Sequence, residues 1–294
     1  MRGRVRRVAI LGHIGRPGVR RAAAKLRTRL ARRGCDVRLE QQLADLMGIE
    51  GAPLPELARW CQLAISLGGD GTVLAGGRAM AGQKGVLLAV NFGGLGFLAA
   101  AEEDELDRAV DAALAGRWKV RERRLLRAAV RRGRKAARVF SRLAMNDAVV
   151  KSAGGLAAVH LQMHALGQDL GYLLADGLIA ASASGSTAYS LSAGGPVLAP
   201  DVEALVVTPV CAHTLGSRAL VLAADDELSL RLIGSVDHSI LLLDGQEMVE
   251  LEPGDTIRVR LDRAAVRCLR NPERPFARSL EAKLGWQGSA RRSL

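Results

Sequence analysis

The sequence predicts an α/β N-terminal domain, an all-β C-terminal domain built as a β-sandwich, and a C-terminal helix that returns to the N-terminal domain. Three observations lead to this fold class. Helix-like and strand-like hydrophobic periods alternate over residues 1–118, short β-rich runs replace them over residues 119–265, and one amphipathic stripe lies within residues 266–294. A chain of 294 residues is also long enough for two domains that each bury a core.

The first domain opens with a βαβ pattern. Residues 5–11 form an apolar strand, residues 18–33 carry a helical stripe that stops at Gly34, and residues 36–39 form a second strand. Helix and strand patterns continue to alternate after this, which favours a sheet covered by helices. The further elements predicted are a helix at 55–60, a strand at 63–67, a helix from 72, a strand at 86–90 and a helix at 102–114.

The second domain is predicted from the density of short β-rich runs. The alternation of helices and strands ends at Gly116. Such closely spaced strands favour a mostly antiparallel sandwich. The strands predicted are 139–150, 157–165, 171–174, 178–181, 205–207, 220–222, 228–232, 240–243 and 256–261.

The tail is predicted to contain one amphipathic helix. Phe276, Leu280 and Leu284 lie at i, i+4 and i+8, and Gly285 and Trp286 end the pattern. A single apolar stripe needs a surface to cover it, and we expect that surface on the first domain.

The most informative turn is LGGDGT at residues 67–72, directly after a buried-looking strand. Glycines on both sides of Asp70 let a ligand approach the backbone and allow positive φ. Turns of this kind cradle phosphates, whereas Asp70 would repel one; its expected role is to orient a ribose hydroxyl or accept its proton. The alternative interpretation is a tight turn with an acidic helix cap.

Three other segments are candidate ligand contacts. NFGGLGFL at 91–98 is a second glycine turn after a strand, and open α/β sheets bind ligands at such edges. The run at 182–196, SASGSTAYSLSAGGP, is rich in hydroxyl groups and glycine, which suits a polar ligand or else a flexible linker. Asp244 and Gly245 predict a type I′ hairpin turn, from which Gln246 could face a ligand.

Composition narrows the class of protein. The net charge of +12 raises the possibility of nucleic-acid binding, but the basic residues are not interleaved with aromatics, so we expect no nucleic-acid partner. No apolar run has the length of a membrane span and no signal-peptide pattern is present, so we expect a cytoplasmic protein without a membrane partner.

The cysteine and histidine patterns give no metal site. The four cysteines are widely spaced and are expected to be reduced, mostly buried thiols. His160 and His164 lie in a segment that alternates like a strand, where the two side chains share a face without the geometry of a metal site.

Several motifs, in this order along the chain, resemble the NAD kinase family, which transfers a phosphoryl group to the 2′-hydroxyl of the adenosine ribose of NAD to give NADP. Similar GGDG turns occur in diacylglycerol kinases, sphingosine kinases and 6-phosphofructokinases, so GGDGT alone does not discriminate. The discriminating motifs are NFGGLGFL, MNDAVV at 145–150, DGLIAASASGSTAYSLSAGGPVLAP at 176–200, TPVCAHTLGSRALVL at 208–222, DGQ at 244–246 and LEAKLGW at 280–286.

The resemblance implies roles at matched positions. Asp70 would be the base or orienting acid for the 2′-hydroxyl, Gly71 would lie against the nucleotide, and Phe97 would pack against a base. Asn146 and Asp147 stand where the family has an Asn-Glu pair that binds NAD. Further residues implied to contact the dinucleotide are Asp176, Ser184, Thr187, Ala188, Tyr189, Ser190, Leu191, Ser192 and Gln246.

The resemblance also implies an ATP- or polyphosphate-dependent enzyme that uses Mg²⁺ or another divalent cation with the phosphoryl donor. It implies a homo-oligomer, a dimer or tetramer, assembled through the second domain. Two alternative functions are consistent with part of these motifs: a non-catalytic NAD(H)-binding sensor and a GGDG-type lipid kinase. The chain departs from the family where Ser182, Ala183, Ser184 and Gly185 replace its usual Thr-Pro-Thr-Gly. It also departs where Ala75, Gly76 and Gly77 replace the bulkier residues that are common after GGDGT.

Overall fold

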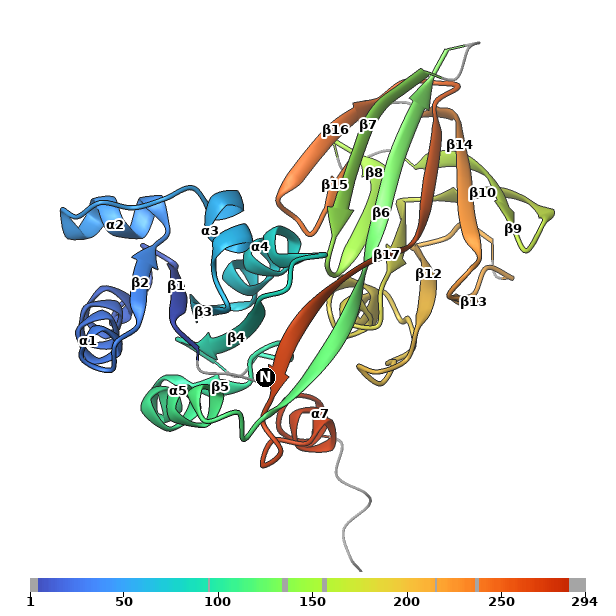
Figure 1. Cartoon of the computed structure of the whole chain (residues 1–294). Helices are drawn as coiled ribbons and strands as arrows, with labels where there is room; N and C mark the ends of the chain where they lie inside the picture. The colour runs from blue at the N-terminus through green and yellow to red at the C-terminus, as the bar shows by residue number, and fades with distance from the viewer. Residues whose placement is uncertain are drawn as a thin grey trace, which may run out of the picture. The chain divides into compact units, whose positions relative to one another are not determined.

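The computed structural model describes residues 5–94, 96–133, 137–154, 158–214, 216–235 and 238–285. The chain divides into two compact units (Figure 1). Unit 1 comprises Met1–Glu122 and Val266–Leu294, and unit 2 comprises Arg123–Ala265. The sequence-based limits at residues 118 and 265 stay our proposal for where the functional domains begin and end.

Unit 1 is built around a parallel sheet with the strand order β2-β1-β3-β4. Every residue of β3 and β4 is buried, as expected for central parallel strands with both faces covered. The short strand β5 pairs with β4, and the last part of β17 meets β4 at Cys268. The strands are β1 (Arg7–Gly12), β2 (Asp36–Leu39), β3 (Leu63–Gly68), β4 (Val86–Asn91) and β5 (Ala101–Glu102).

Helices cover both faces of this sheet. Helices α1 and α5 lie on one face and are joined by ion pairs from Arg29 to Asp107 and Asp111, while α3 and α4 lie on the other (Figure 1). Gly76 lets α4 approach the sheet, because a Cβ there would lie 3.0 Å from Leu11 Cδ1. The helices are α1 (Val19–Arg32), α2 (Gln41–Met47), α3 (Leu54–Trp60), α4 (Asp70–Met80), the 3₁₀ helix η1 (Glu103–Glu105) and α5 (Leu106–Leu114).

Unit 2 is the predicted β-sandwich. One sheet has the order β13-β12-β11-β8-β15-β16, and the other contains β6, β7, β9, β10, β14 and β17. Apolar side chains from both sheets, among them Leu126, Val150, Leu178 and Leu230, form one buried core. Between β11 and β12 lie the 3₁₀ helix η2 (Gly185–Thr187) and α6 (Tyr189–Ser192).

The strands of unit 2 are β6 (Lys119–Arg132), β7 (Ala137–Ala144), β8 (Asp147–Ser152), β9 (Val159–Ala165), β10 (Gln168–Ala175), β11 (Gly177–Ala181), β12 (Ala204–Val210), β13 (Leu220–Ala223), β14 (Glu227–Ser235), β15 (Ser239–Leu243), β16 (Glu247–Leu251) and β17 (Thr256–Arg270). Two of these, β6 and β17, begin or end in unit 1. The predicted single strand at 139–150 is wrong, because Met145 and Asn146 separate β7 from β8.

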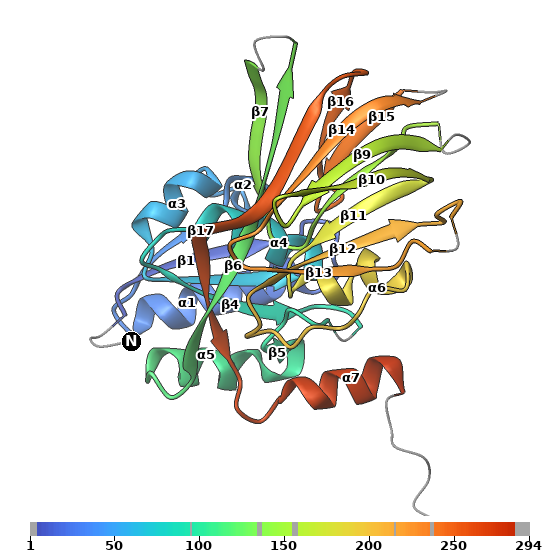
Figure 2. The same cartoon turned by 90° about the vertical axis from the view of Figure 1, so that its right-hand side faces the viewer.

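The C-terminal helix α7 (Phe276–Leu284) packs on the α/β part of unit 1, as predicted, and lies alongside the β5–α5 segment (Figure 2). Leu280 is buried and Phe276 is half-buried, but Leu284 is exposed, so the docked stripe is shorter than predicted. Trp286 lies outside the described residues.

All four cysteines are free thiols, but only Cys61 is buried; Cys35 and Cys268 are half-buried and Cys211 is exposed, so "mostly buried" was wrong for the group. Within the described residues, no helix has the length and apolar character needed to cross a bilayer.

Candidate active site

Three loops of unit 1 meet at the carboxyl ends of β1, β3 and β4. These strands are adjacent and parallel, so the loops that follow them share one edge of the sheet. The loop after β1 is tied to β3 by the His13 N–H, which donates to the Leu67 oxygen at 3.0 Å. The Phe92 N–H donates to the Gly68 oxygen at 3.1 Å and joins the loops after β3 and β4. The two glycine turns therefore lie next to each other at this edge of the sheet.

Asp70 is the first residue of α4, directly after the buried strand β3, and its side chain is half-buried. Gly96 in the NFGGLGFL turn leaves room for the Asp70 carboxylate, because a Cβ at Gly96 would lie 2.4 Å from Asp70 Oδ1. The turn itself is held by Asn91, whose Nδ2 donates to the Gly93 oxygen at 3.1 Å. Gly71, at the second position of α4, is exposed. The glycine at position 96 thus lets the backbone of the second turn lie against the Asp70 carboxylate.

Phe97 does not stand free in this turn, because α7 covers it. The Phe97 and Phe276 ring centroids are 6.3 Å apart, and Lys283 Nζ lies 4.5 Å from the Phe97 centroid. Phe97 is half-buried by these contacts, so part of its surface is used by the tail. A role against a base stays a prediction.

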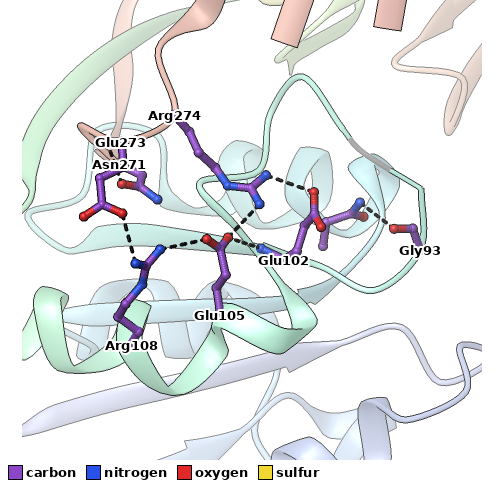
Figure 3. Close-up of polar contacts among 8 residues, drawn as sticks. Gly93, Glu102, Glu105, Arg108, Asn271, Glu273 and Arg274 are labelled. Atoms are coloured by element: carbon purple, nitrogen blue, oxygen red, sulfur yellow. Dashed lines mark hydrogen bonds and ion pairs between the residues drawn. The ribbon is translucent and has the colours of Figure 1, made fainter. Parts of the chain in front are cut away.

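A network of ion pairs holds the start of the tail against the segment that follows the glycine turn (Figure 3). The Arg274 guanidinium donates to Glu102 Oε1 at 2.9 Å and approaches Glu105 Oε2 at 2.8 Å. Arg108 pairs with both Glu105 and Glu273, at 2.8 Å and 3.0 Å. Two arginines between three carboxylates therefore fix the path of the chain into α7.

In unit 2, three turns meet at one end of the adjacent strands β11, β8 and β15. Ala181 at the end of β11 is paired with Asp147 at the start of β8, and Leu243 at the end of β15 is paired with Ala148. The turn at Met145 and Asn146, the loop after Ala181 and the turn after Leu243 therefore lie together. This arrangement brings the predicted residues of the 184–192 loop, the Asn-Asp pair and Gln246 to one place.

Asp244 organises this place by accepting hydrogen bonds from three consecutive backbone N–H groups. Its carboxylate oxygens lie 2.9 Å from the Met145 nitrogen, 2.7 Å from that of Asn146 and 3.2 Å from that of Asp147. Asp244 and Gly245 both have positive φ, +50° and +66°, and the Gln246 N–H donates to the Leu243 oxygen, as in the predicted type I′ turn. The carboxylate thus fixes the backbone that presents the Asn-Asp pair.

The Asn146 and Asp147 side chains are both buried. Asn146 Oδ1 accepts no hydrogen bond within the part of the chain that the structure describes. Burial, and to a lesser extent the negative charge of Asp244, together raise the pKa of Asp147 from 3.8 to about 7. The pair therefore offers an unused amide oxygen beside a carboxyl group that is protonated below neutral pH.

The hydroxyl-rich run after β11 is a packed loop, not a flexible linker. Ser182 Oγ donates to the Met145 oxygen at 2.6 Å, and Ser190 Oγ lies 2.8 Å from Thr208 Oγ1. Gly185 presses against the Asn-Asp turn, since a Cβ there would lie 2.0 Å from the Asn146 oxygen. Ser184 is buried and accepts a hydrogen bond from Arg123 Nη1 at 3.1 Å. Several hydroxyl groups thus stabilise the loop through hydrogen bonds within the chain.

Other residues of the loop present surface outward. Tyr189 is 45% exposed and Ser192 and Gln246 are exposed, whereas Ser190 is fully buried. Thr187, Ala188 and Leu191 are half-buried. Their predicted contacts with a dinucleotide stay predictions.

Asp176 lies apart from the Asn-Asp pair within this chain. It precedes β11, whose first residue Gly177 pairs with Lys151, whereas the pair adjoins the last residue, Ala181. Four residue steps of strand separate the two ends, or roughly 13 Å at about 3.3 Å per residue. Asp176 Oδ1 instead lies 4.0 Å from His213 Nε2, and both side chains are largely exposed.

A doubly wound α/β unit that presents one carboxylate between glycine turns, together with a β-sandwich unit that holds an Asn-Asp pair under a hydroxyl-rich loop, indicates a nucleotide-dependent phosphotransferase. The family model described as the ATP-NAD kinase N-terminal domain matches residues 8–118, and the ATP-NAD kinase C-terminal domain matches residues 145–270. The chain belongs to the NAD kinase family.

Individual relatives agree with this assignment. The chain is 37% identical over 282 residues to an NAD kinase of Geobacter metallireducens, covering 96% of this chain and 99% of the relative. It is 36% identical to NAD kinase 2 of Streptomyces coelicolor, covering 97% of this chain and 98% of the relative.

Solved structures share the fold. Yeast NADH kinase in complex with NADH superposes with a TM-score of 0.89 at 26% identity, covering 100% of this chain and 91% of that one. An NAD kinase from Archaeoglobus fulgidus in complex with ATP gives a TM-score of 0.75 at 22% identity, covering 96% and 100% of the two chains, and supports the fold alone.

Proposed function

We propose that this chain phosphorylates the 2′-hydroxyl of the adenosine ribose of NAD to give NADP. The observation that carries this proposal is the Asp70 carboxylate, which is presented at the sheet edge between two glycine turns in a member of the NAD kinase family. ATP, another nucleoside triphosphate or inorganic polyphosphate would supply the phosphoryl group. A GGDG-type lipid kinase is set aside, because the family models of NAD kinase match both parts of the chain.

Unit 2 supplies groups that suit a dinucleotide. Asn146 Oδ1 is a buried acceptor with no donor among the described residues, so it can receive an amide or hydroxyl hydrogen of NAD. Asp147 can accept a hydrogen bond when ionised and donate one when protonated. Tyr189 and Gln246 are exposed at the same end of the sandwich and can contact the ligand surface. We assign Asp176 to NAD binding from the family resemblance alone.

Asp70 would act on the hydroxyl that is phosphorylated. The 2′-oxygen forms a bond to the terminal phosphorus of the donor while the bond from this phosphorus to its bridging oxygen breaks. The hydroxyl proton passes to the Asp70 carboxylate and then to solvent, and the shortened donor leaves with the bridging oxygen. The carboxylate thus orients the attacking hydroxyl and, by taking its proton, prevents positive charge from building up on the 2′-oxygen.

A divalent cation fits this site as a companion of the donor. Among the described residues, no three or more histidine, cysteine, aspartate or glutamate side chains gather to hold a metal ion. Mg²⁺ in phosphoryl-transfer sites is commonly bound by one or two carboxylates together with phosphates and water, and Asp70 would be such a carboxylate here. When bound, Mg²⁺ neutralises charge on the transferring phosphates.

A homo-oligomer and a cytoplasmic location stay predictions. Strand β10 ends the path of its sheet and exposes Leu170, Tyr172 and Leu174, which are 42%, 64% and 43% exposed. Exposed apolar side chains along an edge strand favour assembly through unit 2.

The direct test is NADP formation by purified protein from NAD, Mg²⁺ and either ATP or polyphosphate. We expect product with at least one donor, and the better donor identifies the donor class. Saturable NAD binding without product under both conditions would contradict the proposal and support the rival function, an NAD(H)-binding sensor.

A further inference from the structure

Arg16 lies on the loop that follows β1 and contacts both glycine turns. A Cβ at Gly93 would lie 2.6 Å from Arg16 Nη1, and a Cβ at Gly69 would lie 3.3 Å from Arg16 Nη2. The guanidinium therefore rests against the backbone of Gly69, which precedes Asp70 in the turn after β3, and against that of Gly93 in the turn after β4. Side chains at Gly69 or Gly93 would occupy the space that the guanidinium uses.

The Arg16 loop is held in place by its own backbone. The Arg16 N–H donates to the His13 oxygen at 3.1 Å, and the Val19 N–H at the start of α1 donates to the Arg16 oxygen at 3.4 Å. Gly18 has a φ of +85°, which turns the chain into α1. Since His13 is bonded in turn to β3, the backbone that carries Arg16 is fixed to the same sheet edge as Asp70.

The charge of Arg16 is not used within unit 1 or elsewhere in the described part of the chain. Its side chain is exposed and makes no hydrogen bond or ion pair with the described residues. Two other arginines of unit 1 are by contrast paired with acids, Arg29 with Asp107 and Arg274 with Glu102. Because the Arg16 guanidinium has no acceptor among the described residues, its N–H groups can donate to solvent or to a ligand.

We propose that Arg16 binds the phosphate chain of the phosphoryl donor and so offsets the repulsion between that chain and Asp70. This inference rests on the proposed function, because it names the donor-binding residue of the same reaction. A guanidinium presents a planar fork of N–H donors that matches phosphate oxygens, and it stays charged at all working pH values. The glycines under it allow a phosphate to approach backbone and guanidinium together.

The pyrophosphate of NAD has the same chemistry as the donor and is the competing ligand. We assign Arg16 to the donor because it lies on unit 1 between the turns that flank Asp70, whereas the unused amide oxygen that suits NAD lies on unit 2. The two assignments differ in which Michaelis constant depends on Arg16.

The test compares Arg16→Gln and Arg16→Lys with a charge-matched control, Arg27→Gln. Arg27 is exposed on α1 and also makes no hydrogen bond or ion pair with the described residues, so its loss changes the net charge equally. Steady-state NADP formation is measured against donor and against NAD. We expect Arg16→Gln to raise the donor KM roughly 10- to 100-fold with the NAD KM changed by less than about twofold. Arg16→Lys should fall between the wild type and Arg16→Gln, because lysine keeps the charge and loses the fork.

A binding measurement separates this inference from the proposed function. Calorimetric titration with inorganic tripolyphosphate reports on Arg16 even when no NADP forms. At least about tenfold weaker binding to Arg16→Gln than to Arg27→Gln supports the inference. Equal affinities would overturn it, as would a rise in the NAD KM at unchanged donor KM. An inactive wild type whose tripolyphosphate binding depends on Arg16 would refute the proposed function and leave the phosphate site in place.

Discussion

The carboxyl group of Asp147 should make the stability of the protein depend on pH, and the substitution Asp147→Asn should remove this dependence. Burial and Asp244 raise its pKa from 3.8 to about 7 in the folded state. Between these two values the folded chain keeps a proton that the unfolded chain has lost. The contribution of Asp147 to the free energy of unfolding therefore falls as pH rises through this window and is constant above it. At 1.36 kcal/mol for each pKa unit, the full loss is about 4 kcal/mol.

Asp147→Asn places a neutral amide of the same size at this position and should cancel this dependence. Denaturant unfolding of the wild type and the variant is measured from about pH 4 to about pH 8. We expect the wild type to lose about 4 kcal/mol relative to Asp147→Asn over this range. Asp225→Asn, at an exposed acid of the same unit, is the control and should follow the wild type. A difference between wild type and Asp147→Asn that stays constant with pH would refute the reasoning.

Three further substitutions test particular contacts. Gly185→Ala forces a Cβ against the Asn146 backbone oxygen and should destabilise the protein by about 2 kcal/mol or more in denaturant unfolding; wild-type stability would contradict this contact. Gly96→Ala places a Cβ 2.4 Å from Asp70 Oδ1, a side-chain atom that can rotate away. We therefore expect kcat to fall about tenfold or more at an unchanged melting temperature. An unchanged kcat would contradict the importance of this contact. Arg274→Ala breaks two ion pairs and should cost about 1–2 kcal/mol, whereas Arg278→Ala, exposed on α7, should cost less than about 0.5 kcal/mol; equal effects would contradict the network.

The succession of an α/β unit and a β-sandwich unit could be predicted from the sequence because it depends on local patterns. Hydrophobic periods and glycine turns located most of the strands and α1, α5 and α7. The strand β6 was missed because arginines fill its exposed positions, so that apolar alternation shows only in its second half. The helix α2 and the strand β16 are short, with only a few buried positions each, and gave no pattern above their surroundings.

Residues of the site could be predicted from the sequence only where they belong to a recognisable local motif. Asp70 and the Asn-Asp pair stand out by spacing and by resemblance, whereas Asp244 was interpreted only as part of a hairpin turn. Its carboxylate bonds with backbone groups 97–99 residues away, a relation that no local window contains. Arg16 was one arginine among many in a basic N-terminal region, and its position over two glycine turns depends on the parallel order of β1, β3 and β4. For Asp244, the only local pattern in the sequence was an acidic residue before a hairpin glycine, which predicts the turn but not the bonds of its carboxylate.

The most direct measurement of the central claim is the turnover of Asp70→Asn at saturating NAD and donor. Asparagine keeps the size of the side chain and removes its basicity, so the variant should fold as the wild type does. We expect NADP formation to fall by roughly 10² or more with saturable NAD binding retained. An Asp70→Asn enzyme with wild-type turnover would show that this carboxylate does not act on the 2′-hydroxyl.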